Sequence, residues 1–170
     1  WALDKGIYVI TDEIYEHLVF DGYETTSVLK QVPELADKCI ILNGVAKTYA
    51  MTGWRVGWMI SSKEIAKAAT NLMSHSTSNV NNIAQRAALE AITGDQSQVE
   101  EMRQAFQRRG IAMWEMFNQI PKVICNKPQG AFYCFPSFEG YIGSTISGIK
   151  IDSTLKLCEV FLEEIKVAAV

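Results

Sequence analysis

The chain has 170 residues, of which 48% are hydrophobic and 21% charged, so extended disorder and collagen-like structure are excluded. The formal net charge is -3, which gives no electrostatic reason to expect nucleic acid as a partner. No apolar run approaches the ~18 residues that a membrane-spanning helix needs, so we expect no membrane partner. The chain opens with Trp1-Ala2-Leu3 and ends on Val167-Ala168-Ala169-Val170, and we expect it to be an internal piece of a longer protein.

The cysteines and histidines give little support to a metal site. The four cysteines form no C-x-x-C pair, and His17 and His75 form no H-x-x-x-H pair. We therefore expect no metal, and instead free, mostly buried thiols in a reducing, cytoplasmic location. A Ser-His hydrolase is also disfavoured, because the sequence contains no G-x-S-x-G motif.

Apolar runs predict strands that alternate with helices in the first part of the chain. Ser62 is a suitable N-cap for the first long helix, Gly94 follows the second, and Pro121 marks the end of the third. The segment 21–38 carries scattered charges and is predicted to be irregular. The predicted elements are strands at residues 6–11, 39–43 and 54–60 and helices at residues 63–74, 80–92 and 97–119.

The pattern changes after Pro121. Two short strands, a loop rich in glycine, a helix capped by Ser153 and a final strand are predicted there. The two strands are expected at residues 123–125 and 131–135, and the loop at residues 136–152. The helix is expected over about a dozen residues after Ser153, and the final strand at residues 166–170. The fold class is therefore α/β: residues 1–110 form part of a large domain with a mainly parallel sheet, and residues 111–170 begin a smaller α+β domain.

Polar residues follow the first two predicted strands directly. Asp12-Glu13-Ile14-Tyr15 comes after the first strand, and Asn43-Gly44-Val45-Ala46-Lys47-Thr48 after the second. In open α/β sheets ligands bind beyond the carboxyl ends of the strands, so these residues can face a ligand. Taken singly, the aspartate is more often a turn former or helix cap, and the lysine a solvated surface residue.

Arg55 lies in a mostly apolar segment between Trp54 and Trp58. An arginine in such surroundings requires an anionic partner, because an unpaired buried charge is costly. That partner is either a carboxylate such as Asp12 or Glu13, or a phosphate, which the planar guanidinium binds through two parallel hydrogen bonds.

Together these residues meet the needs of pyridoxal phosphate. This cofactor requires an amine, a carboxylate that keeps its ring nitrogen protonated, a donor for its ring oxygen and a cation for its phosphate. Lys47, Asp12, Tyr15 and Arg55 would fill these roles in that order.

At this point the sequence resembles the class I and II aminotransferases, pyridoxal-phosphate enzymes of fold type I. The resemblance rests on the lysine segment Gly44–Gly57, on Thr11–Leu18 with its Asp-x-x-Tyr, and on Gly130-Ala131-Phe132-Tyr133. The resemblance covers essentially the whole chain. The amino-acid sequence of the lysine segment is most similar to that of bacterial-type aspartate and aspartate/prephenate aminotransferases.

The resemblance implies a fold, a reaction and a set of roles. It implies part of the fold type I large domain and part of the small domain, in an enzyme that is usually a homodimer. The reaction would move an amino group between an amino acid, aspartate or glutamate, and a 2-oxo acid. Lys47 would carry the cofactor as a Schiff base and act as general base and acid, with Asp12, Tyr15 and Arg55 holding the ring nitrogen, ring oxygen and phosphate.

Two departures and several alternatives accompany the resemblance. Gly44 stands where many relatives carry a phosphate-binding serine, and Ser74 stands where animal-type aspartate enzymes carry a substrate-binding arginine, four residues before the pair Ser78-Asn79.

Prephenate or aromatic aminotransferases, lyases and the non-catalytic effector domain of a transcription regulator remain alternatives. Because the family's N-terminal cofactor contacts and C-terminal substrate arginine are missing, we expect the isolated chain to bind the cofactor poorly and to be inactive.

Overall fold

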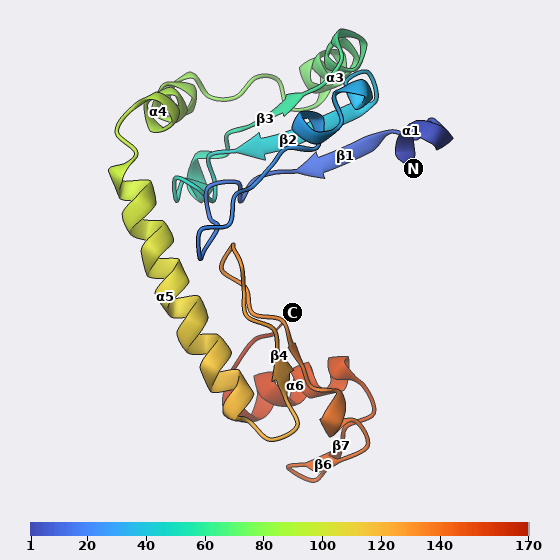
Figure 1. Cartoon of the computed structure of the whole chain (residues 1–170), viewed down its shortest axis with the longest axis vertical. Coiled ribbons are helices and arrows are strands. Elements are labelled where there is room, and N and C mark those ends of the chain that lie inside the picture. The colour runs from blue at the N-terminus through green and yellow to red at the C-terminus, as the bar shows by residue number, and fades with distance from the viewer. Residues whose placement is uncertain (170) are drawn as a thin grey trace. The chain divides into compact units, whose positions relative to one another are not determined.

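The computed structural model describes residues 1–169, which form two compact units (Figure 1). The first unit contains residues 1–107 together with 129–131, and the second contains residues 108–128 and those from 132 onward. The long helix α5 (Ser97–Gln119) begins in the first unit and ends in the second. The assignment of residues 1–110 and 111–170 to the large and small domains of a complete enzyme stays a prediction.

A three-stranded sheet organises the first unit. It contains β1 (Val9–Asp12), β2 (Cys39–Gly44) and β3 (Gly57–Ile60) in that order. β1 runs parallel to β2, whereas β3 runs antiparallel to it. The connection between β2 and β3 contains no α-helix of the kind that usually makes the crossover between parallel strands. The α/β fold class is confirmed.

The core of the first unit lies against the start of β2. Cys39 and Ile41 point inward and pack with Leu35. Short helices that the sequence did not predict pack against this core: α1 (Ala2–Lys5), α2 (Val28–Gln31) and the 3-10 helix η1 (Pro33–Leu35). A second 3-10 helix, η2 (Thr52–Trp54), lies in the connection between β2 and β3. Elements of a single turn are too short for hydrophobic periodicity to reveal.

The long helices agree with their predicted positions because their caps and apolar stripes are explicit in the sequence. The caps are Ser62, whose side chain accepts from Ile65 N, Asn81, and Ser153, which accepts from Lys156 N at 3.2 Å. The helices are α3 (Lys63–Ser76), α4 (Asn82–Thr93), α5 and α6 (Thr154–Ile165). No helix of residues 1–169 is both long and apolar enough to cross a membrane.

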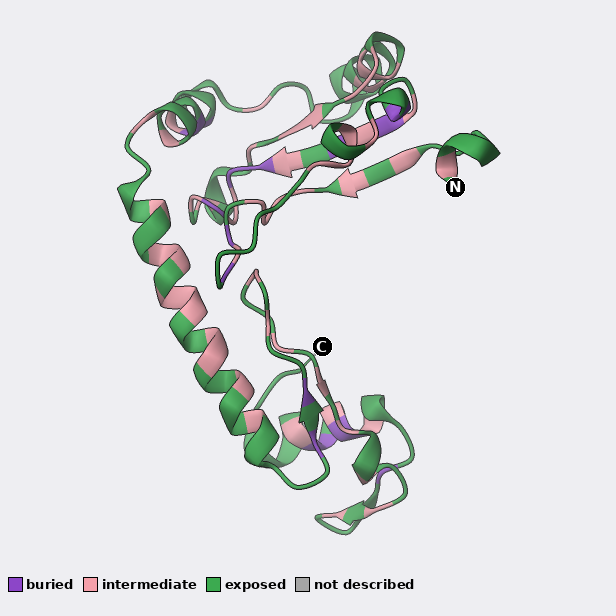
Figure 2. Cartoon of the chain, in the orientation of Figure 1, coloured by how far each residue is buried: buried purple, intermediate pink, exposed green. Residues whose placement is uncertain are grey.

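The second unit has a small core and two short hairpins. Its core contains Ile151, Leu157 and Val160, the last two on α6. Figure 2 colours the buried residues purple. The hairpin strands are β4 (Ile124–Cys125) with β5 (Pro136–Ser137), and β6 (Thr145–Ile146) with β7 (Ile149–Lys150), and the 3-10 helix η3 (Glu139–Tyr141) lies between the hairpins.

Three sequence predictions in this region were wrong. Residues 131–135 form no strand, because Ala131 is left-handed (φ 58°) and the adjacent Gly130 bridges to Val19 instead. The predicted loop 136–152 contains the β6–β7 hairpin, whose two-residue turn Ser147-Gly148 has positive φ at both positions. The predicted strand 166–170 is not formed over residues 166–169, and residue 170 lies outside the described residues.

Candidate active site

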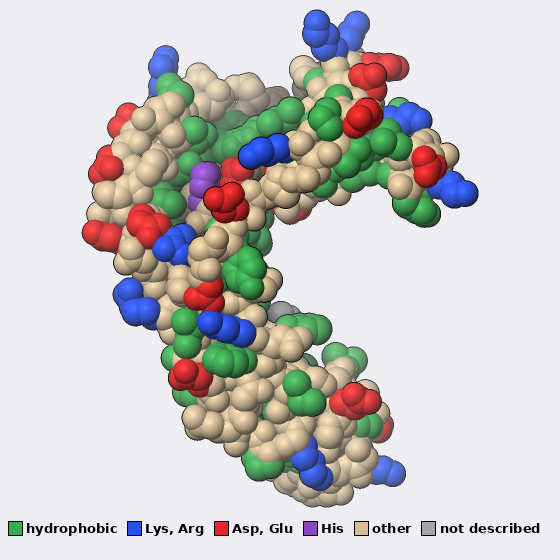
Figure 3. Space-filling view, in the orientation of Figure 1, with side chains coloured by type: hydrophobic (Ala, Val, Ile, Leu, Met, Phe, Trp, Pro, Cys, Tyr) green, Lys and Arg blue, Asp and Glu red, His purple; other side chains and the backbone are tan. Residues whose placement is uncertain are grey.

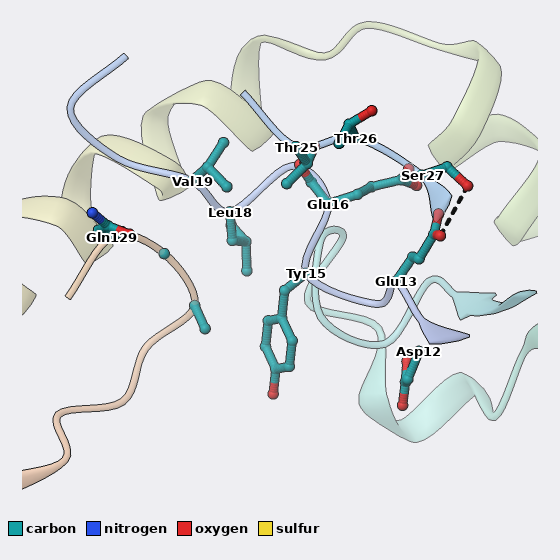
Figure 4. A pocket seen from close by; sticks show the side chains of 12 residues that line it. Asp12, Glu13, Tyr15, Glu16, Leu18, Val19, Thr25, Thr26, Ser27 and Gln129 are labelled. Carbon is teal, nitrogen blue, oxygen red and sulfur yellow. Dashed lines mark hydrogen bonds between the residues drawn. The ribbon is translucent and has the colours of Figure 1, made fainter. Parts of the chain in front are cut away.

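The turn after β1 presents Asp12 and Tyr15 on one side. Oδ1 of Asp12 accepts from the backbone N of Ile14 at 3.2 Å, so the aspartate shapes the turn while its side chain stays exposed. Figure 4 shows Asp12 and Tyr15 pointing the same way, whereas Glu13 points toward Ser27. Ser27 Oγ donates to Glu13 Oε1 at 2.9 Å, which fixes that carboxylate away from Asp12.

Lys47 lies in the turn that follows β2, next to Tyr15. Buried Val45 and Thr48 anchor this turn, and Val45 N donates to the Val56 carbonyl at 3.2 Å. Nζ of Lys47 lies 5.9 Å from the centroid of the Tyr15 ring, within cation–π range. The structure thus brings the segment after β1 and the lysine segment together.

Gly44 explains the departure from the serine of many relatives. A Cβ at this position would lie 2.8 Å from the Val56 carbonyl oxygen and 3.1 Å from Gly57 Cα. Any side chain would force β2 and β3 apart, so the close approach of these strands requires glycine here.

Arg55 is exposed, and the expectation that it is surrounded by apolar side chains was wrong. Its backbone is left-handed (φ 54°, ψ 48°), and Nη1 of its side chain donates to the Thr52 carbonyl at 2.8 Å. Among residues 1–169 it makes no ion pair with Asp12 or Glu13, and no hydrogen bond to Lys47. The guanidinium therefore shares the β2–β3 connection with Lys47 and is open to solvent.

A hydrogen bond between Glu16 and Asn43 was missed by sequence reasoning. Asn43 Nδ2 donates to Glu16 Oε1 at 2.6 Å. The sequence contained a signal for this contact. Glu16 follows Tyr15 and Asn43 precedes the lysine segment, and the parallel pairing of β1 and β2 brings both segments to the same edge of the sheet. Burial, and next the Glu16 charge, raise the pKa of Tyr49 in the lysine segment.

A cavity of about 490 Å³ lies beside these residues. Asp12 and Tyr15 line it together with the hydroxyl-bearing segment Thr25–Ser27 and with Gln129–Ala131 (Figure 4). Ala131 N donates to the Leu18 carbonyl at 2.7 Å, so the Gly-Ala pair of the third motif reaches the edge of the same cavity.

The donor set fits pyridoxal phosphate. A primary amine, a phenol and a carboxylate gather at the carboxyl edge of a parallel strand pair, where α/β proteins bind cofactors, and an exposed guanidinium follows in the same connection. Metal chemistry has no comparable donor set, since no cluster of three or more His, Cys, Asp or Glu that could hold a metal occurs in the described part of the chain. This set of side chains is the one that a cofactor bound through a lysine amine requires.

Comparison with known proteins narrows the class of protein to which the chain belongs. The model of the family aminotransferase class I and II matches residues 2–170. The aspartate aminotransferase of Streptomyces avermitilis is 56% identical over 170 residues, which are 100% of this chain and 42% of that enzyme. The aspartate/prephenate aminotransferase of Cereibacter sphaeroides is 42% identical over 165 residues, 96% of this chain and 41% of that enzyme. The crystal structure of the aspartate aminotransferase from Rhizobium meliloti has a TM-score of 0.92 and 35% identity over 99% of this chain and 42% of that one.

The chain therefore belongs to the class I and II aminotransferase family, whose members depend on pyridoxal phosphate. The resemblance drawn from the three motifs is confirmed. The chain spans about 42% of the length of the relatives it matches.

Proposed function

We propose that the protein containing this chain is a pyridoxal-phosphate-dependent aminotransferase that uses Lys47. One observation carries the proposal: Nζ of Lys47 lies 5.9 Å from the Tyr15 ring, with Asp12 pointing the same way as Tyr15. When bound, pyridoxal phosphate supplies the carbonyl carbon that takes the amino group and a ring that withdraws electrons. Lys47 would hold the cofactor through Nζ until the substrate amine displaces it, and the freed amine would then move the proton from the substrate Cα to the cofactor carbon that takes the amino group.

The other three residues hold and tune the cofactor. The Asp12 carboxylate pairs with the ring nitrogen and keeps it protonated, since an anion favours the charged form of its neighbour. The Tyr15 hydroxyl donates to the ring oxygen. The Arg55 guanidinium, exposed and held by the Thr52 carbonyl, binds the phosphate through charge-assisted hydrogen bonds.

We propose aspartate or glutamate as amino donor and a 2-oxo acid as acceptor, because relatives at 56% and 42% identity are named aspartate and aspartate/prephenate aminotransferases. The runner-up is an aminotransferase for prephenate or aromatic substrates, and a lyase or a non-catalytic effector domain ranks below it. Assays with aspartate and 2-oxoglutarate, run against prephenate and aromatic amino acids, discriminate these. Turnover of none of the pairs would favour the last two.

A homodimer in the cytoplasm is the assembly and location that we propose for the complete protein. Support comes from exposed apolar side chains on α4, which follows Ser78-Asn79: Ile83 is 73% and Leu89 53% exposed. The four cysteines are free, in keeping with a reducing compartment. Analytical ultracentrifugation of the complete protein tests the dimer, and a monomer at micromolar concentration would contradict it.

Replacement of Lys47 tests the role of the amine. In the protein expressed from its complete gene, Lys47→Ala should lower kcat by at least about a hundredfold, since proton transfer by a positioned group contributes about 10²–10⁴. It should also abolish the visible absorbance of bound cofactor. Lys63→Ala, at the exposed start of α3, is the matched control and should change neither. A Lys47→Ala protein that kept both signals would contradict the proposal.

A further inference from the structure

The Asn43–Glu16 hydrogen bond joins the two segments that carry Lys47 and Tyr15. At 2.6 Å it is short, as expected for a carboxylate acceptor, which makes a hydrogen bond about twice as strong as a neutral one. The same Glu16 oxygen lies 3.6 Å from Nε2 of the exposed His17. Both bonded side chains are half-buried, so water competes less for them than at an open surface.

Each partner is also fixed within its own segment. The backbone N of Glu16 donates to the Glu13 carbonyl at 3.0 Å, and Thr25 Oγ1 donates to the Glu16 carbonyl at 2.8 Å. Asn43 is paired in the sheet, and its Oδ1 accepts from Gly44 N at 2.7 Å. Because neither residue can shift alone, a bond between them transmits the position of one segment to the other.

This bond lies just beyond the point where backbone pairing stops. The last backbone hydrogen bond between the segments runs from Glu13 N to the Leu42 carbonyl at 2.8 Å. Tyr15 and Lys47 follow after the ladder, in turns whose separation no strand pairing sets. The side-chain hydrogen bond between Glu16 and Asn43 is therefore well placed to set the separation of Tyr15 and Lys47.

We propose that Glu16 and Asn43 are positioning residues, which hold Tyr15 and Lys47 at the separation that cofactor binding requires. The inference rests on the proposed function. The two residues act through their neighbours and need not touch the cofactor themselves.

A binding titration of the protein expressed from its complete gene tests the proposal. Pyridoxal phosphate is added to cofactor-free protein, and its dissociation constant is read from absorbance. Glu16→Ala should raise the constant on the order of tenfold, the loss expected for a hydrogen bond to a charged group. Glu16→Gln should recover most of the affinity, because its amide oxygen still accepts from Asn43. Glu24→Ala, exposed in the same unit, is the matched control.

The double variant shows whether the two residues act as a pair. Glu16→Ala combined with Asn43→Ala should bind no more weakly than the weaker single variant, because either change already removes the shared bond. Additive losses would overturn the proposal. If Glu16→Ala does not fold, Glu16→Met, which also removes the acceptor and keeps the length of the side chain, takes its place in the cycle.

Thermal unfolding of the cofactor-free variants separates positioning from stability. A purely structural residue would lower the unfolding midpoint and leave the dissociation constant unchanged well below that midpoint, and this result would overturn the proposal. If the unaltered protein binds the cofactor and Glu16→Ala binds equally well, the positioning role fails and the proposed function stands. If the unaltered protein does not bind the cofactor, both fail.

Discussion

At the scale of single residues, Asp12 has two separable tasks. Its Oδ1 accepts the Ile14 N–H and shapes the turn, while the proposed function assigns its negative charge to the cofactor ring nitrogen. Asparagine keeps an oxygen in the same place and loses the charge. The two tasks can therefore be told apart by one substitution.

We predict that Asp12→Asn leaves the stability of the fold within about 0.5 kcal/mol, since the turn keeps its acceptor. The same change should lower kcat by at least about a hundredfold, because an amide cannot hold the ring nitrogen protonated. Chemical denaturation and steady-state kinetics measure the two effects. An Asp12→Asn enzyme of nearly full activity would show that the aspartate only forms the turn.

Gly44 lies at the end of β2, where the backbone approaches the start of β3 closely. We predict that Gly44→Ala destabilises the protein by about 1–3 kcal/mol, because the new Cβ would lie 2.8 Å from the Val56 carbonyl oxygen. Gly53→Ala is the control, since a Cβ there meets no atom within 4 Å. Urea denaturation curves measure the difference. Equal midpoints for the two variants would show that β2 and β3 can separate without cost.

At the scale of elements, the first turn of α5 carries an ion pair that also reaches a loop. Arg103 donates to both carboxylate oxygens of Glu100 at 2.7 Å and, through Nη1, to the Val19 carbonyl at 3.0 Å. Acidic and basic side chains both occur along α5 on the face drawn in Figure 3. The hydrogen bonds from Arg103, and next from Gln104, lower the pKa of Glu100 from 4.5 to about 2.

A lowered pKa in the folded state means that ionised Glu100 stabilises the fold above its ordinary pKa. That contribution should be lost as the pH falls from 4.5 toward 2. We therefore predict that Glu100→Gln makes the stability less dependent on pH in this window, and that salt reduces the difference because the pair is exposed. Thermal midpoints from pH 5 to pH 2 measure it, with the neighbouring Glu101→Gln as control. Identical pH profiles for all three proteins would contradict the assignment.

The elements differ in how far the sequence could predict them. Helices α3 and α6 were predictable because Ser62 and Ser153 cap them, and α4 and α5 because their apolar positions repeat with the helical period. The 131–135 strand was not, because a β-rich composition does not reveal which backbone a segment will pair with. In the candidate site, the motifs predicted Lys47, Asp12 and Tyr15, whose role stays a proposal. The left-handed backbone of Arg55 was not predictable, because its residue type does not favour that conformation.

At the scale of the whole molecule, this chain spans about 42% of the length of its relatives. The family's N-terminal turn that binds the ring oxygen, and its glycine-rich phosphate turn, do not occur within these 170 residues. Under the proposed function, Lys47, Asp12, Tyr15 and Arg55 would supply only part of the cofactor contacts that the family resemblance implies. Each missing hydrogen bond to a charged group removes about 1.5–3 kcal/mol of binding.

We predict that residues 1–170 produced alone bind pyridoxal phosphate at least about a hundredfold more weakly than the protein expressed from its complete gene. Absorbance titration of both proteins measures the ratio, and circular dichroism shows whether the shorter protein keeps its helices. Stoichiometric, tight binding by the shorter protein would mean that the present residues suffice.

The identity of the cofactor-binding lysine is the central claim. Borohydride reduction of the complete protein with bound pyridoxal phosphate, followed by mass mapping of its peptides, tests this most directly. We predict a pyridoxyl group on the peptide that contains Lys47 and none on that peptide in Lys47→Ala. A pyridoxyl group on another lysine, or on none, would contradict the account.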